Sequence, residues 1–334
     1  MYIKADRILS GITGGAINSA QLQTLLADPG YLGAFRSGIL YSPPRRDVLL
    51  ASPQAAAVVA GSALAVGELL AKPSICTEVL ADSTWSATLV GSPTAAPVVY
   101  ANATGLATLF GADRKAVYAP HAAQMTLSGS EVTAWRNYVG SAHLSGGAAG
   151  ARPTFDGPVR NGFTSLAFDG ANDYLAGGSS GLFSASDSTF YLVFRPTTMT
   201  GQRAWISSSA PNSGYFGASS STGQLVIDNG GYIDFPWQAA PVANTWQMFR
   251  LRKSTAANAW YVKRNAESEM ALSAYLMASA GSLGVGYRSN GSYLPERFFA
   301  GQFAEIINLG KSAGDADADN IRITELLRSK YSIW

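Results

Sequence analysis

The sequence predicts an α+β multidomain chain, in which a small helical N-terminal and repeat region precedes an all-β jelly-roll sandwich. Three observations support this fold class. The aromatic residues are unevenly divided, since 28 of the 36 Phe, Trp and Tyr lie at or beyond Trp135. The first part is rich in Ala, Leu and Val at helical spacing, whereas the second alternates aromatic and polar residues. A repeat of about ten residues ends the first part.

These changes in composition divide the chain of 334 residues into three expected parts. Residues 1–50 form an N-terminal helical attachment region. Residues 51–115 form a Ser/Ala repeat region of short helical turns. Residues 116–334 form the β-sandwich, because the aromatic and alternating pattern begins there.

Residues 16–40 have the pattern of short helices. Asn18 or Ser19 can cap the first of them, and Leu22, Leu25 and Leu26 lie on one face. The run from Asp28 to Gly30 contains Pro29 and is expected to end that helix.

The repeat region consists of six consecutive units. Each has a Ser or Asn start, a small residue near the fourth position and a large apolar pair, at a spacing of 9–12 residues. We place the starts at Ser52, Ser62, Ser74, Ser83, Ser92 and Asn102. The apolar pairs are Val58-Val59, Leu69-Leu70, Val79-Leu80, Leu89-Val90, Val98-Val99 and Leu109-Phe110. Each unit is about two helical turns, so it needs stacking on its neighbours, within one chain or across chains. The pattern resembles the Ser-x-x-Ala-type units of bacteriophage tail-fibre and tail-spike proteins.

The second part of the chain contains short runs of alternating polarity separated by Gly, Asn, Ser and Pro, which predicts strands. We expect strands at Leu166–Phe168, Thr189–Phe194, Ala204–Ser207, Tyr215–Gly217, Gln224–Ile227, Trp246–Arg252, Trp260–Lys263, Leu283–Tyr287 and Phe298–Leu309. Their inward side chains include Leu166, Phe168, Leu175, Trp246, Phe249, Trp260 and Val262. Asp315, Asp317 and Asp319 precede a final helix as its acidic first turn.

Six segments of this part, in order, resemble the concanavalin A-like superfamily in its LamG-like branch. They are VTAWRNYVGSAHLSGGAAGARPTF, NGFTSLAFDGANDYL, STFYLVFRP, NTWQMFRLRKSTAANAWYVKRNAES, FFAGQFAEIINLGKS and ITELLRSKYSIW. The resemblance implies a concanavalin A-like jelly roll over about 200 residues, but it says little about activity. Many members of that superfamily hold calcium near a sheet rim. Asp169, Asn172 and Asp173 match the turn motif and have suitable oxygen ligands, so calcium is a possible cofactor.

Composition excludes several function classes. The chain has 24 Lys+Arg against 22 Asp+Glu, so it lacks the basic excess that nucleic acids or anionic membranes require. The single Cys76 excludes an intrachain disulfide and a cysteine zinc site. No run of residues is apolar enough to predict a transmembrane segment, and the start MYIKADRILSG lacks the apolar core of a signal peptide. We therefore expect synthesis in the host cytoplasm without export.

Catalysis is not expected. Glucanases of this superfamily use three acids in a Glu-x-Asp-x-x-Glu pattern on one strand, where alternate side chains share a face. Glu267 and Glu269 lack the third acid and lie in an expected loop.

Sugar binding needs an aromatic platform with planar hydrogen-bonding side chains. The candidate glycan-binding residues are Tyr232, Trp237, Tyr287, Arg288, Asn290 and Tyr293. Segment 286–297 is the strongest candidate, because it joins aromatic residues to Arg and Asn in an expected turn.

Together these features predict a non-catalytic phage virion protein of the tail fibre or baseplate. Its N-terminal region would attach to other tail or baseplate proteins, the chain would form a homotrimer, and its jelly roll would bind a host-surface glycan. Two alternatives stay open. One is a tail glycosidase that degrades polysaccharide, and the other is a purely architectural protein whose jelly roll contacts neighbouring subunits.

Overall fold

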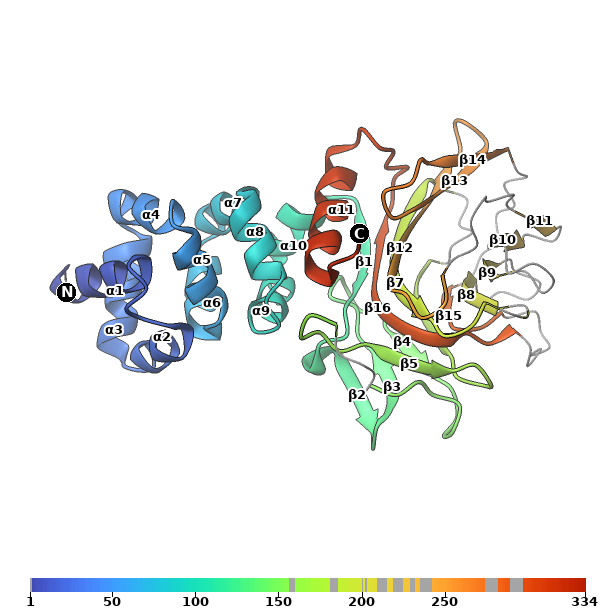
Figure 1. Cartoon of the computed structure of the whole chain (residues 1–334), viewed down its shortest axis with the longest axis horizontal. Coiled ribbons are helices and arrows are strands. Elements are labelled where there is room, and N and C mark those ends of the chain that lie inside the picture. The colour runs from blue at the N-terminus through green and yellow to red at the C-terminus, as the bar shows by residue number, and fades with distance from the viewer. Residues whose placement is uncertain are drawn as a thin grey trace. The chain divides into compact units, whose positions relative to one another are not determined.

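The computed structural model consists of two compact units (Figure 1). The structure describes residues 2–155, 160–180, 186–199, 201, 203–208, 215–218, 225–228, 232–234, 242–273, 282–288 and 297–334. The helical unit contains Met1–Ala112 and Ile321–Ser332. The sandwich unit contains Asp113–Asn320 and Ile333–Trp334. The predicted order of a helical region followed by a β-sandwich is therefore confirmed.

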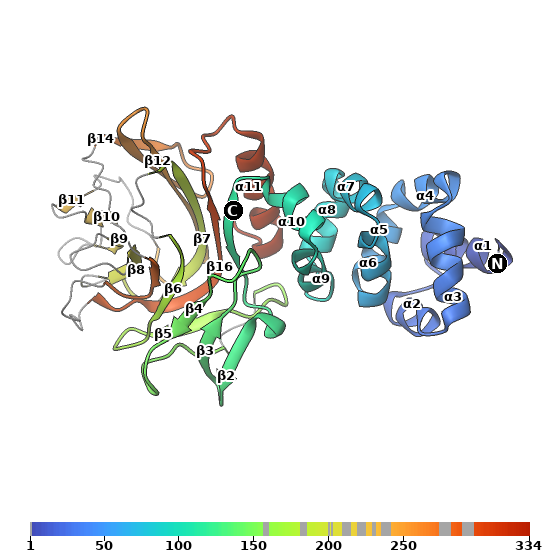
Figure 2. The same cartoon turned by 180° about the vertical axis from the view of Figure 1, so that it is seen from behind.

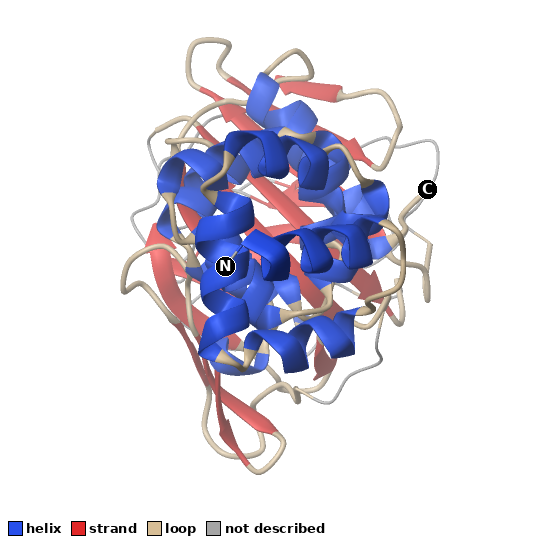
Figure 3. Cartoon of the chain, turned by 90° about the vertical axis from the view of Figure 1, so that its left-hand side faces the viewer, coloured by secondary structure: helices blue, strands red, loops and turns tan. Residues whose placement is uncertain are grey.

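The helical unit is built from short helices joined by turns of a few residues (Figure 3). Before the repeat they are α1 (Tyr2–Thr13), α2 (Ser19–Leu26), α3 (Pro29–Gly33), the π-helix η1 (Ala34–Leu40) and α4 (Pro43–Leu50). The repeat contains α5 (Pro53–Ala60), α6 (Ala63–Leu70), α7 (Pro73–Ala81), α8 (Ser83–Val90), α9 (Ala95–Ala101) and α10 (Ala103–Phe110). The last helix of the chain is α11 (Ala318–Tyr331). In the described part of the chain no single helix is long and apolar enough to cross a membrane; α5 and α6 meet that test only as a pair, bent by 111°.

The start of α2 has the predicted cap. Asn18 Oδ1 accepts from the backbone N–H of Gln21 at 2.9 Å, and Gln21 Oε1 accepts from the N–H of Asn18 at 2.9 Å. This reciprocal capping box satisfies two donors that an isolated helix leaves free. Leu22 and Leu26 are buried on the predicted face, and Asp28 begins the next helix by accepting from the N–H groups of its first turn.

The repeat has a uniform period of ten residues. Its units begin at Ser52, Ser62, Lys72, Asp82, Ser92 and Asn102. Two adjacent pairs are buried in every helix: Ala55-Ala56 and Val59-Ala60, Ala65-Val66 and Leu69-Leu70, Ile75-Cys76 and Val79-Leu80, Trp85-Ser86 and Leu89-Val90, Ala95-Ala96 and Val99-Tyr100, Gly105-Leu106 and Leu109-Phe110. The pairs are four residues apart, so both lie on one helix face.

This period corrects the predicted register at two units. The structure begins them at Lys72 and Asp82, where the sequence prediction had Ser74 and Ser83. The proline after Lys72 occupies the first helical turn, where a missing N–H has no cost. Asp82 is the cap of α8, because its carboxylate accepts from the N–H three residues later at 2.9 Å.

One of the predicted apolar pairs is likewise shifted by one residue. In α5 the predicted Val58 and Val59 are both buried, together with Ala60, whereas in α9 the second buried pair is Val99-Tyr100 and Val98 is half-buried. The shift follows from the ten-residue period, because the fourth position after the first buried pair must face the same way.

The units stack as a solenoid within one chain. Each helix contacts the next, and it also contacts the helix three units later: α5 packs on α8, α6 on α9 and α7 on α10. The chain therefore completes one superhelical turn about every three helices. Each unit is too short to be stable alone, and this stacking buries its apolar face.

Cap residues also join successive turns of the solenoid. The Ser92 hydroxyl accepts from the N–H of Ala95 in its own helix and donates to Ala60 O at 2.7 Å, one turn earlier. Asn102 also has both roles, since its Oδ1 caps α10 while its Nδ2 donates to Leu70 O at 3.1 Å. One side chain thus satisfies a helix start and a helix end.

At Asp82, the hydrogen bond to the carbonyl one turn earlier is made by a different side chain. An ionised carboxylate can cap a helix, but it has no hydrogen to donate. The carbonyl of Leu50, one turn earlier, instead accepts from the indole Nε1 of Trp85 at 2.8 Å. The donor that Asp82 lacks is therefore supplied by Trp85, three residues later.

The C-terminal segment Ile321–Ser332 packs with the helical unit. Arg322 Nε donates to Leu109 O at 2.8 Å, at the C-terminal end of α10. The buried Lys330 donates to the Tyr100 hydroxyl at 3.3 Å, with its ammonium 4.6 Å from that ring. These contacts cover the last turn of the solenoid, whose apolar surface would otherwise meet water.

This placement differs from the expected division of the chain. The sandwich was expected over 116–334, whereas its unit starts at Asp113 and excludes Ile321–Ser332. The physical reason is that Arg322 and Lys330 of this segment bond Leu109 and Tyr100 of the solenoid, while Ile323, Leu326 and Leu327 are buried. Residues 1–50 and 51–112 also form one compact unit, where two parts were expected.

The sandwich unit contains two antiparallel sheets (Figures 1 and 2). The strands are β1 (Arg114–Tyr118), β2 (Met125–Ser128), β3 (Glu131–Trp135), β4 (Leu144–Gly146), β5 (Leu166–Asp169), β6 (Leu175–Ser180), β7 (Ser188–Pro196), β8 (Arg203–Ser208), β9 (Tyr215–Ala218), β10 (Leu225–Asp228), β11 (Tyr232–Asp234), β12 (Gln247–Ser254), β13 (Ala259–Arg264), β14 (Met270–Ser273), β15 (Ser282–Val285) and β16 (Ala300–Leu309). One sheet has the order β1-β16-β7-β12-β13-β14, with β5 also paired to β16. The other has the order β11-β10-β9-β8-β15-β6-β4-β3-β2.

All the predicted strands are present, within a few residues at their ends. The core between the sheets contains the predicted Leu166, Phe168, Leu175, Phe249, Trp260 and Val262. Trp246 was expected there and is half-buried just before β12. β16 pairs with β7 over a long stretch, from Thr189–Leu309 to Pro196–Gly301, and the register shifts once, between Phe303 and Glu305.

Candidate functional site

A tight turn between β5 and β6 organises one rim of the sandwich. Asp169 Oδ1 accepts from the backbone N–H groups of Ala171 at 2.8 Å and Asn172 at 3.2 Å. Asp173 Oδ2 accepts in return from the N–H of Asp169 at 2.9 Å. Gly170 has φ +79°, a conformation that glycine adopts without strain. The Asp-Gly turn signal in the sequence is therefore confirmed, and the two carboxylates determine the shape of this rim.

Burial changes the acidity of one of these carboxyl groups. Asp173 is 6% exposed, and burial raises its pKa to about 6. The nearby carboxylates of Asp169 and Glu131 raise it further, against the hydrogen bond from the Asp169 N–H. The group therefore changes its charge near neutral pH, unlike an ordinary aspartate.

The loop before the turn is tied to it by side-chain hydrogen bonds. Asn172 Nδ2 donates to Gly150 O at 2.8 Å, and the N–H of Gly150 donates to Glu131 Oε1 at 3.0 Å. Arg152 donates through Nε to Gly147 O at 2.7 Å and pairs with Glu131 at 3.4 Å. The loop is therefore held between β3 and the turn, which fixes the direction of its polar side chains.

An aromatic pair lies beside this network. The ring centroids of Tyr174 and Tyr287 are 4.8 Å apart. Tyr287 is 4% exposed, whereas Tyr174 is half-buried. A Cβ on Gly147 would lie 2.6 Å from the Tyr174 ring, so only glycine allows this approach. We call Glu131, Arg152, Asn172, Asp173, Tyr174 and Tyr287 the rim cluster.

Arg203 connects the rim cluster to the far end of segment 286–297. Its Nη1 donates to Gly170 O at 3.0 Å and to Phe298 O at 2.8 Å. The N–H of Phe299 donates to Gly286 O at 2.8 Å and closes the base of the same segment. Two regions more than a hundred residues apart in sequence therefore share one rim.

The structure brings some of the sequence-predicted site residues together and separates others. Asp169, Asn172, Asp173 and Tyr287 meet at the rim. Arg288 lies elsewhere, with its guanidinium carbon 5.4 Å from the centroid of the Tyr215 ring. Tyr232 lies on β11. The side chain of Tyr232 and the whole of Trp237, Asn290 and Tyr293 fall outside the described residues.

The expected calcium site remains a prediction. Across the described ranges, no group of three or more His, Cys, Asp or Glu is placed to hold a metal ion. Asp169 and Asp173 instead accept hydrogen bonds from the turn backbone, and the Asn172 amide Nδ2 donates to the Gly150 carbonyl. These three residues act here as a turn and a loop tether.

Sequence reasoning missed three members of the rim cluster. Tyr174 could have been predicted, because it directly follows the predicted turn residues Asn172 and Asp173. Glu131 and Arg152 carry no local signal, since their pairing depends on how β3 lies against a loop some twenty residues later.

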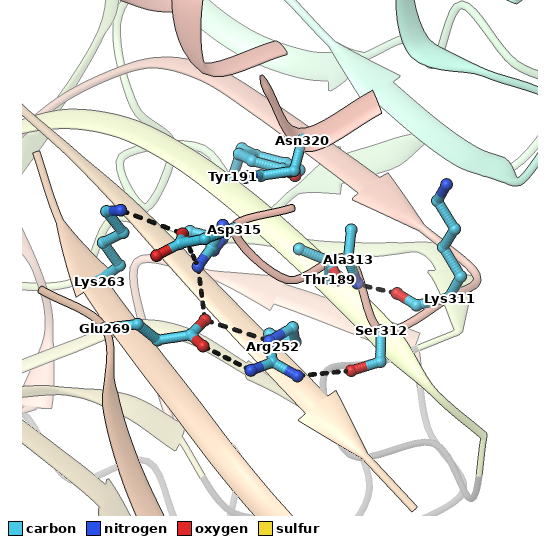
Figure 4. Close-up of polar contacts among 11 residues, drawn as sticks. Thr189, Tyr191, Arg252, Lys263, Glu269, Lys311, Ser312, Ala313, Asp315 and Asn320 are labelled. Atoms are coloured by element: carbon cyan, nitrogen blue, oxygen red, sulfur yellow. Dashed lines mark hydrogen bonds and ion pairs between the residues drawn. The ribbon is translucent and has the colours of Figure 1, made fainter. Parts of the chain in front are cut away.

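A charged network lies on the outer face of β12 and β13 (Figure 4). Arg250 contacts Glu269 at 2.5 Å and Asp315 at 2.7 Å, and Lys263 contacts Asp315 at 3.0 Å. Arg252 pairs with the second oxygen of Glu269 at 2.5 Å. Although burial opposes it, hydrogen bonds from Lys263 and Arg250 lower the pKa of Asp315.

This network accounts for the acidic pair that was weighed as a catalytic candidate. Glu269 bridges Arg250 and Arg252, and Glu267 pairs with Arg264. Both acidic side chains are therefore engaged in ion pairs with arginines of the sandwich unit. Asp317 and Asp319 belong to the start of α11, where Asp317 Oδ1 accepts from the N–H of Asp319 at 2.9 Å.

Comparison with known proteins gives only distant likenesses. No protein-family model matches the sequence, and no curated protein is similar to it. Among solved structures, domain 4 of an extracellular arabinanase from Geobacillus stearothermophilus, in complex with arabinotriose, matches with TM-score 0.43 and 15% identity, covering 64% of this chain and 98% of that one. The carbohydrate-binding module of a Ruminococcus gnavus sialidase, bound to sialyllactose, matches with TM-score 0.34 and 9% identity, covering 43% and 93%. A Trypanosoma rangeli sialidase matches with TM-score 0.46 and 10% identity, covering 65% of this chain and 33% of that one. These values are too low to assign a family or to transfer a ligand.

Proposed function

We propose that the sandwich unit is a carbohydrate-binding module and that the rim cluster is its contact surface. The observation that carries the proposal is the half-buried Tyr174 beside the exposed Asn172. Arg152 of the tethered loop and Glu131 of β3, with side chains 20% and 30% exposed, belong to the same cluster. An aromatic face stacks on a sugar ring, and amide, guanidinium and carboxylate groups bond its hydroxyls.

The hydrogen bonds within the rim cluster favour a binding surface. Loop ordering on binding costs free energy, and a loop that is already held avoids most of that cost. The Asn172–Gly150 and Arg152–Gly147 bonds hold this loop. The function proposed is therefore recognition by a preformed surface, carried on the helical unit as its attachment part.

Binding of the full chain to a glycan array tests the proposal. We expect retention of at least one class of surface glycan. Tyr174→Ala should weaken it roughly tenfold, because aromatic stacking contributes about 1 kcal/mol or more. Tyr41→Ala is the matched control, since Tyr41 is 43% exposed in the helical unit. Absence of any bound glycan, or equal binding by Tyr174→Ala, would overturn the proposal.

The placement of the protein in a phage tail fibre or baseplate and its trimeric state remain predictions from the repeat pattern. Its host-surface glycan partner remains a prediction from the jelly-roll domain. The glycosidase alternative predicts release of reducing ends from a bound polysaccharide. The ion pairs of Glu267 and Glu269 with arginines support the non-catalytic proposal over this alternative.

A further inference from the structure

A row of small side chains crosses the outer face of the sheet that contains β3, β4, β6, β15 and β8. Ala134 of β3 pairs with Ser145 of β4, which pairs with Ala176 of β6. Ala176 also pairs with Gly284 of β15, and Gly284 pairs with Ser207 of β8. We call Ala134, Ser145, Ala176, Gly284 and Ser207 the small-residue row.

The small-residue row faces away from the core of the sandwich. Direct cross-strand partners share one face of a sheet, and the residues next to them in sequence point to the opposite face. Those sequence neighbours lie in the core between the sheets, and they are Trp135, Leu144, Leu175, Leu283 and Ile206. The row therefore belongs to the outer face.

The Tyr174 and Tyr287 rings of the rim cluster lie along one side of this row. Tyr174 comes two residues before Ala176 on the extended chain, so both face the same way. A Cβ on Gly147 would lie 2.6 Å from the Tyr174 ring, and a Cβ on Gly284 would lie 3.0 Å from the Tyr287 ring. Each ring thus lies over a glycine, and the rim cluster continues directly into the row.

The row is closed at one end and accessible at the other. Gly284 and Ser207 are buried, whereas Ala134 and Ala176 are half-buried and Ser145 is exposed. Neighbouring strands lie about 4.8 Å apart, so the accessible part spans about 10 Å from β3 to β6. This length exceeds that of one sugar ring. The row carries no charge and no side chain larger than serine, so a flat neutral ligand can approach the backbone.

A hydroxyl without a partner lies at the closed end. Ser207 is fully buried, and its Oγ forms no hydrogen bond with the described residues. A Cβ on Gly284 would lie 2.4 Å from this Oγ, so the hydroxyl points along the row toward β15. Buried hydroxyls normally have a hydrogen-bond partner, because an unpaired polar group in the interior costs free energy. A sugar hydroxyl that enters the row from Ala176 supplies that partner.

We propose that the small-residue row extends the rim cluster as a contact surface for linear, neutral oligosaccharides of at least two sugars. One sugar lies beside Tyr174, and the next lies over Ala176 and Ser145. Sugar rings have apolar faces that pack on a flat uncharged surface, and their hydroxyls bond to serine hydroxyls. This inference rests on the proposed carbohydrate-binding function and specifies its ligand class.

The test measures how affinity depends on oligosaccharide length. The probes are fragments of one, two, three and six sugars from four linear neutral polymers, namely cellulose, amylose, chitin and linear arabinan. Their dissociation constants for the full chain are measured by calorimetry. In the series that binds, we expect the trisaccharide to bind at least about tenfold more tightly than the single sugar.

Two variants locate this gain in affinity. Ser145→Gln places a longer neutral side chain in the accessible part of the row, so it should make the trisaccharide bind no better than the single sugar. Ser128→Gln is the matched control, because Ser128 is also exposed but lies on β2, outside the row. Ser207→Ala should weaken trisaccharide binding roughly threefold to tenfold without lowering the melting temperature, since the Ser207 hydroxyl has no partner to lose.

The outcomes separate this inference from the function on which it rests. Equal affinity for the single sugar and the trisaccharide, or unchanged trisaccharide binding by Ser145→Gln, would overturn the row as a contact surface while glycan binding at the rim cluster stands. If other glycans bind on the array but none of the four series does, the linear neutral class is wrong. If the array is also empty, the carbohydrate-binding function fails with it.

Discussion

At the residue scale, the rim of the sandwich depends on a carboxyl group in an unusual state. Asp173 is buried, accepts the N–H of Asp169 and faces the carboxylates of Asp169 and Glu131. Its pKa of about 6 means that the folded protein retains a proton that the unfolded chain has released. Folding stability therefore depends on pH in a range where most aspartates are already ionised.

The sign of this dependence can be tested. Because the folded pKa lies above the unfolded value, Asp173 lowers stability as pH rises from about 4 to about 6, and the full penalty remains above that range. The penalty amounts to about 3 kcal/mol for a shift of about two pKa units. Asp173→Asn, which retains an acceptor for the Asp169 N–H, should be more stable at pH 7 and should flatten this slope. Urea unfolding followed by tryptophan fluorescence measures both.

The matched control for that experiment is Asp113→Asn, whose side chain is 56% exposed in the same unit. It should leave the slope between pH 4 and pH 6 unchanged. A stability of the unaltered chain that stays constant over this range would contradict the assignment to Asp173.

At the element scale, the short helices of the solenoid are stabilised by cap residues with two roles. Ser92 satisfies the start of its own helix and the end of α5 one turn earlier, whereas Ser52 caps α5 through the N–H of Ala55. No bond to an earlier turn is formed by Ser52 within the described structure. Comparing substitutions of the two serines therefore separates the stability that a cap contributes to its own helix from the stability contributed by the bond to the earlier turn.

We expect Ser92→Ala to lower the free energy of unfolding by about 2 kcal/mol and Ser52→Ala by about 1 kcal/mol. A lost helix cap costs about 1 kcal/mol, and a lost buried hydrogen bond costs a similar amount. Denaturation followed by circular dichroism at 222 nm measures the helical unit. Equal losses for the two variants would show that the bond to Ala60 contributes nothing.

How far the sequence predicts these elements depends on how local their causes are. The strand containing Phe190 to Phe194 and the capping box of Asn18 could be predicted, because alternation and capping are visible in neighbouring residues. The true register at Lys72 could not, since a lysine does not resemble a cap and only stacking of the units defines the period. The pairing of Glu131 with Arg152 and the convergence of Arg288 and Arg297 on Tyr215 depend on tertiary structure, so no local pattern signals them.

At the scale of the whole molecule, two segments that are far apart in the sequence form one helical unit. Residues Met1–Ala112 build the solenoid, and Ile321–Ser332 covers its last turn. Repeat arrays need such terminal caps, because the end units otherwise expose the apolar face that inner units bury. The sequence resemblance assigned this segment to the sandwich, since its motif follows the strands in order.

Removal of residues 321–334 should therefore destabilise the helical unit. We expect the melting transition followed at 222 nm to fall to lower temperature, because Leu109 O and the Tyr100 ring lose their partners Arg322 and Lys330. Lys330→Met is the point variant that keeps the chain length, and it should shift the same transition by a smaller amount. A transition at the original temperature in the shortened chain would show that the segment is not a cap.

The ten-residue unit has a consequence for how such a chain can change length. Three helices complete one turn, so an insertion or deletion of a single unit would rotate everything beyond it by about 120° around the solenoid axis. A change of about thirty residues would restore the original rotation around the solenoid axis and change only the length of the solenoid. Length variation among chains built on this plan should therefore occur in steps of whole turns wherever the direction of the distal unit is under selection.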